Sequence, residues 1–250
     1  TESMLTGSDY STVDFSGRLD ITIFDKPLLL STNNNDGFLN SPFEYFVQKN
    51  TIYNGQVDVL NGEFVFEFIV PKDISYQYGK GKISYYASDN IMGEANGVDK
   101  DILIGGVNEN AFSDLDGPEI QLFIDDTNFV SGGYTNSDPN LLALLFDKSG
   151  INTVGIGIGH NITATLDGDQ NSQYILNDYY EADLNSFQSG HVMYPFSNLI
   201  SGEHTLKLKV WDVYNNSSEQ EIEFFVTSSN DLAIQHLLNY PNPASSFTRF

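Results

Sequence analysis

Residues 202–226 form the stretch that most restricts how this chain can fold. Apolar and polar residues alternate in two runs, separated by the polar segment Asn215–Ser218. Such alternation predicts two antiparallel strands joined by a turn, each with one buried side and one solvent-facing side. The positions expected to face the core are Leu206, Leu208, Val210, Ile222, Phe224 and Val226. A hairpin with one apolar face needs a second sheet to cover that face, so a β-sandwich is predicted.

The register of this hairpin is predicted by its charges. Lys207 and Lys209 lie on the outer face of the first run, and Glu221 and Glu223 lie on the outer face of the second. Opposite charges on neighbouring strands attract each other and favour one pairing of the strands.

Two Asn-Gly dipeptides are the main local signals in the first half of the chain. Asn54-Gly55 and Asn61-Gly62 each suit a type I′ hairpin turn, so we predict a three-stranded meander around them. The inner face of this meander is expected to carry Ile52, Val57, Val59, Phe64, Phe66, Phe68 and Val70.

Further strands are predicted along the whole chain. Alternating apolar residues indicate strands at 19–23, 83–87, 120–124, 154–158 and 162–166. The segments Gly79–Gly81 and 167–190 are interpreted as a turn and a long loop. Leu141–Phe146 is a continuous apolar run, short enough for a strand that is covered on both faces.

The fold class and the division into domains follow from these patterns. No window longer than about ten residues sustains a helical period, so the chain is predicted to be all-β. We predict two Ig-like antiparallel β-sandwich domains in tandem, at residues 1–110 and 111–228, because each such domain needs about 100 residues.

Composition excludes several classes of function. The 250 residues include 34 Asp and Glu against 11 Lys and Arg, a net charge of -23, which argues against nucleic-acid binding. This charge suits a soluble exterior protein, an acidic surface, or carboxylates that bind Ca²⁺. The chain has no cysteine, which excludes disulfides, thiolate nucleophiles and cysteine-type zinc sites.

The two ends of the chain are expected to be cuts in a longer protein. The sequence opens with no signal peptide pattern, and no apolar run approaches the roughly 18 residues needed to span a bilayer. The second domain is followed by a short polar segment that we expect to be a linker.

Two groups of acidic residues are candidate calcium sites. Asp114, Asp116, Asp125 and Asp126 are expected to gather at the seam between the domains, where Ca²⁺ would relieve their repulsion. Asp167, Asp169, Asn171 and Asp178 follow an EF-hand-like spacing. That loop lacks the glycine at its sixth position and has no flanking helices, so a solvated loop without metal remains the alternative.

Aromatic residues supply a candidate interaction site. Trp211 is expected on the face opposite Leu208 and Val210, where it could stack on a sugar or pack under a loop. Tyr179 and Tyr180 form a second aromatic cluster. The four histidines show no zinc-ligand spacing, and no catalytic constellation can be assembled, so a hydrolase is not supported.

Short motifs along nearly the whole chain together resemble one family. In order they are Tyr53–Gly55, Asn61–Phe64, Val70–Ile74, Asp116–Ile120, Ser149–Asn152, Gly157–His160, Asp178–Tyr180, Gly202–Leu206 and Trp211–Asn216. Their order and spacing resemble the PorU family of gingipain-like cysteine peptidases, the cell-surface sortases of the type IX secretion system in Bacteroidetes. Tyr240–Pro243 with Phe247-Thr248 resembles the opening of a type IX C-terminal sorting domain, so residues 229–250 are expected to be a linker and the incomplete start of that domain.

The resemblance implies a non-catalytic segment that follows the peptidase domain. In that family the nucleophilic cysteine and its histidine partner lie in the preceding peptidase domain, and no catalytic residue can be placed on this chain. The implied role is an accessory region at the outer face of the outer membrane. Its implied partners are the upstream peptidase domain of the same protein, the outer-membrane protein PorV and cargo sorting domains. The alternative is a stand-alone carbohydrate-binding or adhesive module around Trp211 or Tyr179 and Tyr180. For either function no cofactor is expected, apart from a structural Ca²⁺ at the acidic groups.

Overall fold

The computed structural model describes residues 2–4, 14–33, 35, 42–89, 93–154, 159–169 and 173–227. These residues form β-strands and one short 3-10 helix, η1 (Asn177–Tyr179), and none of them lies in an α-helix. The predicted all-β class is therefore confirmed, and the several antiparallel sheets are consistent with β-sandwich domains.

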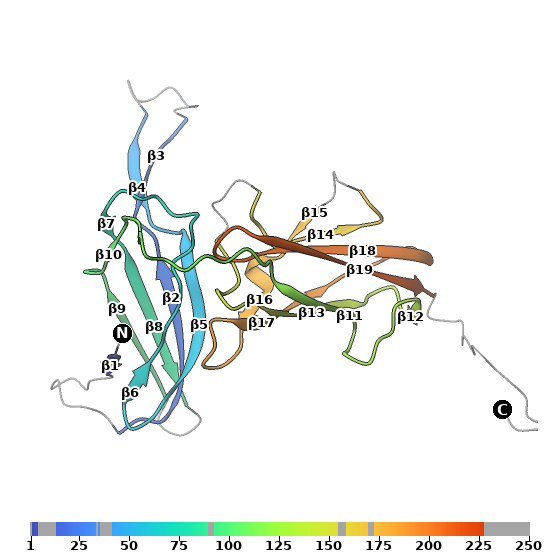
Figure 1. Ribbon diagram of the computed structural model, residues 1–250, viewed down its shortest axis with the longest axis horizontal. Coiled ribbons are helices and arrows are strands. Elements are labelled where there is room, and N and C mark those ends of the chain that lie inside the picture. The colour runs from blue at the N-terminus through green and yellow to red at the C-terminus, as the bar shows by residue number, and fades with distance from the viewer. Residues whose placement is uncertain are drawn as a thin grey trace, which may run out of the picture.

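The N-terminal unit is built on a four-stranded antiparallel sheet (Figure 1). In spatial order its strands are β5 (Thr51–Val59), β2 (Gly17–Phe24), β8 (Lys82–Ser88) and β9 (Glu94–Asp99). Three two-stranded ribbons accompany it: β1 (Glu2–Met4) with β6 (Glu63–Val65), β7 (Gly79–Lys80) with β10 (Leu103–Ile104), and β3 (Leu28–Ser31) with β4 (Glu44–Val47).

One hydrophobic cluster, the first core, holds this unit together. The alternation that predicted strand 19–23 places Leu19, Ile21 and Ile23 in the core, and each is fully buried. Ile83 and Ala87 of β8 are buried beside them, as predicted. Burial of these side chains is the main term that stabilises the sheet, at about 1.5–3 kcal/mol for each fully buried aliphatic side chain.

Of the two predicted Asn-Gly turns, one is confirmed and the other is wrong. Asn61 and Gly62 have φ of 54° and 82°, and Leu60 pairs with Glu63 across them, as a type I′ turn requires. Asn54 and Gly55 instead lie inside β5, paired with Thr22 and Ile21 of β2.

The side chain of Tyr53 explains why Gly55 lies in a strand. A Cβ atom at Gly55 would collide with the hydroxyl of Tyr53, so the glycine gives that buried ring its space. The ladder with β2 is irregular here: Tyr53 pairs with Ile23 and Thr51 pairs with Phe24, which leaves Ile52 as a bulge residue. Ile52 and Tyr53 are consequently both buried.

The rest of the predicted meander holds in part. Val57, Val59, Phe64 and Phe66 are buried, Phe68 packs against the first core, and Val70 is exposed. The predicted turn at Gly79–Gly81 is wrong, because Gly79 and Lys80 form strand β7 and pair with β10.

The C-terminal unit consists of two sheets that enclose the second core (Figure 1). One sheet has the order β11 (Glu119–Ile124), β13 (Asn140–Phe146), β17 (Ser189–Pro195) and β16 (Tyr180–Ala182). The other has the order β12 (Gly133–Thr135), β19 (Ser217–Val226), β18 (Gly202–Trp211), β14 (Thr163–Leu166) and β15 (Gln173–Ile175). The strand pairs are antiparallel except β12 with β19.

The hairpin of β18 and β19 follows the predicted pattern. Leu206 pairs with Ile222, and all six residues expected in the core are buried. The glutamate that the lysines meet is Glu219, whose carboxylate lies 3.6 Å from the Lys207 ammonium and 3.2 Å from that of Lys209. The turn occupies 212–216, so Ser217 and Ser218 already belong to β19.

The predicted loop at 167–190 is wrong, because it contains β15, η1, β16 and the start of β17. These strands of three residues are too short to show an alternating pattern in the sequence, although Tyr180 and Ala182 point into the second core. Of the predicted strand 154–158, only Val154 lies within the described residues.

Candidate functional site

The two units meet at a junction that begins with the edge strand β5. Gln56 forms a bridge with Leu184, and the backbone N–H of Asn185 donates to the carbonyl of Gln56 at 2.8 Å. The Asn185 amide then pairs with Asp58, because Nδ2 donates to Oδ2 at 2.7 Å and Oδ1 accepts from the Asp58 N–H at 2.9 Å. The segment after β16 thus covers the open edge of β5 as a neighbouring strand would.

Asp73 is the polar centre of the junction. It comes from the N-terminal unit, its side chain is 7% exposed, and it contacts three side chains of the C-terminal unit. Nδ2 of Asn152 and Nδ2 of Asn215 donate to its carboxylate at 2.8 and 2.9 Å, and Nδ1 of His160 lies 2.8 Å from it. A buried carboxylate is stable only with such partners, so the two units hold each other in one arrangement at this point.

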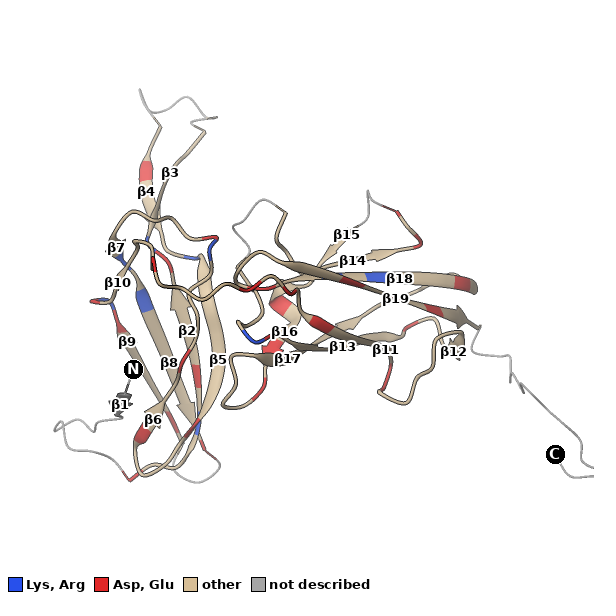
Figure 2. Ribbon diagram, viewed as in Figure 1, with Lys and Arg blue, Asp and Glu red and all other residues tan. Residues whose placement is uncertain are grey.

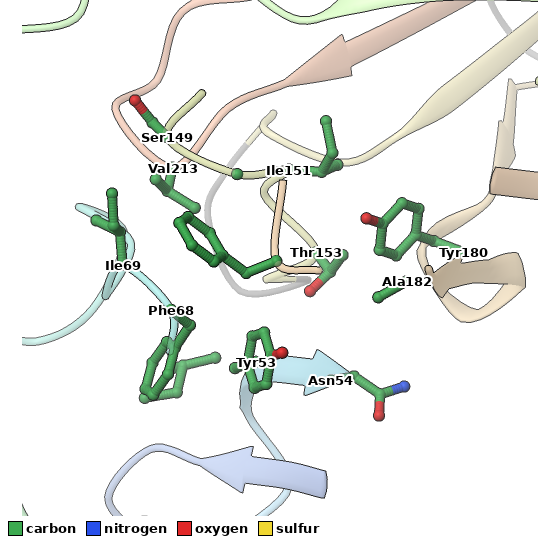
Figure 3. A pocket seen from close by; sticks show the side chains of 13 residues that line it. Tyr53, Asn54, Phe68, Ile69, Ser149, Ile151, Thr153, Tyr180, Ala182 and Val213 are labelled. Carbon is green, nitrogen blue, oxygen red and sulfur yellow. The ribbon is translucent and has the colours of Figure 1, made fainter. Parts of the chain in front are cut away.

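Apolar side chains close the junction (Figure 3). Val154 is fully buried in the first core although it belongs to the C-terminal unit, and Phe187 packs against the same core. Figure 3 shows Tyr53 and Phe68 on one side of a cavity and Ile151 and Tyr180 on the other. The volume of this cavity is about 20 Å³, room for about one water molecule. Burial raises the pKa of Tyr53 to about 12. Close packing of this kind opposes relative motion of the units.

Lys72 adds a second polar contact between the units. Its backbone N–H donates to the carbonyl of Val213 at 2.9 Å, and its Nζ donates to the carbonyl of Tyr214 at 3.1 Å. The ammonium also lies 4.6 Å from the centre of the Tyr214 ring, within range of a cation–π interaction. A groove of about 580 Å³ lies beside this contact, lined by apolar and aromatic side chains of both units.

Three carboxylates converge where the segment between the units meets the C-terminal unit. The ligand oxygens of Asp114, Asp147 and Asp212 all lie within 4.8 Å of one another. Ser149 donates its hydroxyl hydrogen to Asp114, and Nδ2 of Asn216 donates to Asp212 at 2.7 Å. Among the described residues, no lysine or arginine forms an ion pair with any of the three.

Burial has a clear effect on the charge of this cluster. Asp212 is fully buried and Asp147 is 5% exposed. Burial raises the pKa of Asp147 to about 6 and raises the pKa of Asp212 as well. The hydrogen bond from Ser149 lowers the pKa of the more exposed Asp114. Three oxygen ligands at this spacing suit a hard divalent cation such as Ca²⁺, which would offset the repulsion of the charged forms.

The predicted seam group is divided in the structure. Asp114 belongs to the carboxylate cluster, and the N–H of Asp116 donates to Asp114 at 3.1 Å. Asp125 and Asp126 lie beyond the other end of β11, where Asp125 accepts from Thr135 at 2.6 Å and Asp126 accepts from the N–H of Asn128 at 2.7 Å. Only Asp114 of the four is therefore placed among converging carboxylates, and the calcium prediction remains a prediction.

In the second predicted group, Asp167 makes contacts within the protein. Asp167 lies 2.8 Å from Nδ1 of His204 and accepts from the N–H of Thr205 at 3.0 Å. Burial acts to lower the pKa of His204, but its bonds to the Ile200 carbonyl and to Asp167 outweigh this, so the pKa is raised. Asp169 comes directly after the turn at 167–168, which follows β14. Asp178 is exposed in η1, and Asn171 lies outside the described residues.

The predicted aromatic platforms are largely covered. The Trp211 ring lies 4.4 Å from the His160 ring on one side, and the Lys209 ammonium lies 4.8 Å from its centre. Tyr180 is buried in the second core, and burial raises its pKa. Tyr179 is partly exposed and meets Tyr194 edge to face.

Asp73, Asp147 and Asp212 are the site residues that sequence reasoning missed. Asp147 directly follows β13 and precedes Lys148-Ser149-Gly150, and Asp212 directly follows β18 as the first residue of the turn at 212–216. Aspartates at strand ends that precede turn residues were the available signal, and they also occur in ordinary turns.

Comparison with known proteins identifies a longer protein of which this chain resembles a part. No protein family model matches the chain, and no curated protein matches it. Among solved structures, it matches a crystal structure of dimeric latent PorU from Porphyromonas gingivalis with a TM-score of 0.50 and 31% sequence identity. The match covers 97% of this chain and 23% of the PorU chain. The chain thus spans about a quarter of that protein and corresponds to one part of a PorU-like multidomain protein.

Proposed function

We propose that this chain is a non-catalytic accessory region of a cell-surface sortase of the type IX secretion system. In this proposal it supports the upstream peptidase domain and contacts partners, among them the outer-membrane protein PorV and cargo sorting domains. The observation that carries the proposal is the match to PorU over nearly the whole chain at 31% identity. The absence of cysteine supports a non-catalytic role, because a cysteine peptidase needs its thiolate nucleophile.

The junction supports a mechanical role for the region. Three kinds of contact join the two units. Asp73 contributes a buried carboxylate, Asn185 pairs with the edge of β5, and Val154 packs into the first core. A pair of units fixed in this way can hold other domains at a constant separation. We propose the domain bounds 1–110 and 111–228 for these units, with residues 229–250 as a linker and the start of a sorting-type domain. No helix among the described residues is long and apolar enough to cross a bilayer.

The alternative of a carbohydrate-binding or adhesive module has less support. It predicts an open stacking face at Trp211 or at Tyr179 and Tyr180. Trp211 contacts His160 and Lys209, and Tyr180 is buried, so Tyr179 at 42% exposed is the most open of the three rings.

Cargo attachment in cells tests the proposed function. The intact protein would be compared with a variant that lacks residues 1–228 of this chain and keeps the peptidase domain. We expect surface attachment of cargo to be lost in the deletion variant while the peptidase domain remains folded. Unchanged attachment would contradict the proposal. The variant Asp20→Ala serves as the control, because the Asp20 side chain is 38% exposed and its ion pair is with Arg18, two residues away, at 3.1 Å.

A further inference from the structure

One outer face of the C-terminal unit is apolar where a solvent-facing sheet is normally polar. It belongs to the sheet β11-β13-β17-β16. The strand ladders place Leu144 beside His191, Leu142 beside Met193, and Phe146 beside Ser189, all pointing away from the second core. Phe123 of β11 lies on the same face as the ladder partner of Leu142. The apolar residues of this face are thus Phe123, Leu142, Leu144, Phe146 and Met193. We call these five residues the apolar face.

The opposite outer face of the same unit has the expected polar character. There the outward positions of β18 and β19 include Lys207, Lys209, Glu219, Glu221 and Glu223. Figure 2 shows charges of both signs along β18 and β19 and none along β13. The difference between two sheets of one unit shows that the apolar face is a local feature of this sheet.

The sequence of β13 predicts that this face is covered. Leu141–Phe146 has the continuous apolar pattern of a strand with neighbours on both sides. The structure buries Leu141, Ala143 and Leu145 in the second core but leaves Met193 50%, Phe146 40% and Leu144 38% exposed. Large exposed apolar patches on proteins mark surfaces of interaction.

The apolar face continues into the junction. A groove of about 490 Å³ between the units is lined by Tyr53 and Val65 on one side and by Phe187 and Gln188 on the other. Gln188 directly precedes Ser189, the ladder partner of Phe146. A body seated on the apolar face would therefore also reach the groove between the two units.

The charged residues around the apolar face are mainly acidic. Glu119 lies at the start of β11, and Glu181 and Asp183 flank His191, with 3.9 Å between its ring nitrogens and each carboxylate. Lys148, two residues after Phe146, is a cation in the same region of the chain. Complementary charge on the occupant therefore means lysine and arginine around an apolar centre.

We infer that the apolar face is covered, in the intact protein, by another domain of the same polypeptide that presents an apolar centre surrounded by lysine and arginine. This inference rests on the proposed function, since it assigns the surface by which the region supports its neighbours. The match to about a quarter of PorU provides the longer polypeptide from which that domain comes.

Oxidation of Met193 measures the coverage directly, because methionine oxidation follows solvent exposure. Met193 is 50% exposed in this chain. In the intact protein treated with hydrogen peroxide, mass spectrometry is expected to show oxidation of Met193 slowed at least about fivefold relative to residues 1–250 alone. Equal rates in the two proteins would overturn the inference. Protection that disappears when the intact protein is diluted would also overturn it, because a second copy would then be the occupant.

Two variants of the intact protein complete the test. Leu144→Lys is expected to return Met193 oxidation to the rate of the isolated chain, because a lysine would repel the basic surroundings of the occupant. Ile175→Lys is the matched control, since Ile175 is 60% exposed on the other sheet, and it is expected to keep Met193 protected. An unprotected Met193 in a protein whose cargo attachment still needs residues 1–228 would refute this inference and leave the proposed function standing. If Met193 is protected but cargo attachment does not need residues 1–228, the proposed function is refuted and this inference stands.

Discussion

Replacing Asp73 by alanine removes the polar centre of the junction and is expected to destabilise the chain strongly. The carboxylate is 7% exposed and contacts Asn152, His160 and Asn215, all from the other unit. Asp73→Ala leaves these three side chains facing a site without an acceptor.

The expected size follows from these contacts. Hydrogen bonds to a charged group contribute about 1.5–3 kcal/mol each, but bonds that share one acceptor do not add fully. A buried donor left without its acceptor costs about 1–3 kcal/mol. We therefore expect Asp73→Ala, which leaves the Asn152 and Asn215 amides without this acceptor, to lower the free energy of unfolding by about 3 kcal/mol. Asp73→Asn keeps one oxygen acceptor and is expected to cost about 2 kcal/mol.

Urea unfolding of residues 1–250, followed by circular dichroism and tryptophan fluorescence, measures both values. Trp211 is the single tryptophan, and its ring lies 4.4 Å from His160, so the fluorescence reports on the junction itself. Asp20→Ala is the control and is expected to cost less than about 0.5 kcal/mol, because exposed ion pairs contribute little. A loss below about 0.5 kcal/mol for Asp73→Ala would refute the role assigned to this carboxylate.

Three further results are expected. Because the pKa of Asp147 is raised to about 6, the folded state holds its proton more tightly than the unfolded state, and the free energy of unfolding falls as the pH rises from about 4 to 6. Asp147→Asn is expected to raise the free energy of unfolding at pH 7 by about 2–3 kcal/mol and to reduce its dependence on pH. An unchanged pH dependence in urea titrations of this variant would contradict the expectation. Ca²⁺ is expected to raise the melting temperature of the wild-type chain but not of Asp147→Asn, and equal wild-type melting temperatures in Ca²⁺ and in chelator would rule out the calcium prediction. Gly55→Ala is expected to cost about 1–3 kcal/mol by displacing the Tyr53 ring, whereas an unaltered urea midpoint would show that the ring moves freely.

The sequence predicted those elements whose pattern is long and local. The β18–β19 hairpin has two runs with an uninterrupted period of two, and its core positions and strand pairing were predicted correctly. Asn61-Gly62 forms its turn, because Leu60 and Glu63 pair directly across it. Asn54-Gly55 did not, because β2 pairs along the whole of β5 and outweighs the local turn preference.

The site was less accessible to sequence reasoning, for a physical reason. Asp114 was singled out as a candidate ligand, but the structure joins it to Asp147 and Asp212, which are distant in the chain and whose segments are brought together by the fold. The partners of Asp73 likewise come from three separate segments. A local pattern cannot show such convergence, since each residue alone resembles one in an ordinary turn or loop.

The central claim is that the two units form one rigid body through the junction. The chain has no cysteine, so cysteines introduced at Asp99 of β9 and Glu221 of β19 can carry spin labels without a competing thiol. Pulsed electron–electron double resonance between these labels is predicted to give one narrow distance distribution, which Asp73→Ala broadens. A broad or two-peaked distribution in the otherwise unmodified chain would contradict the claim.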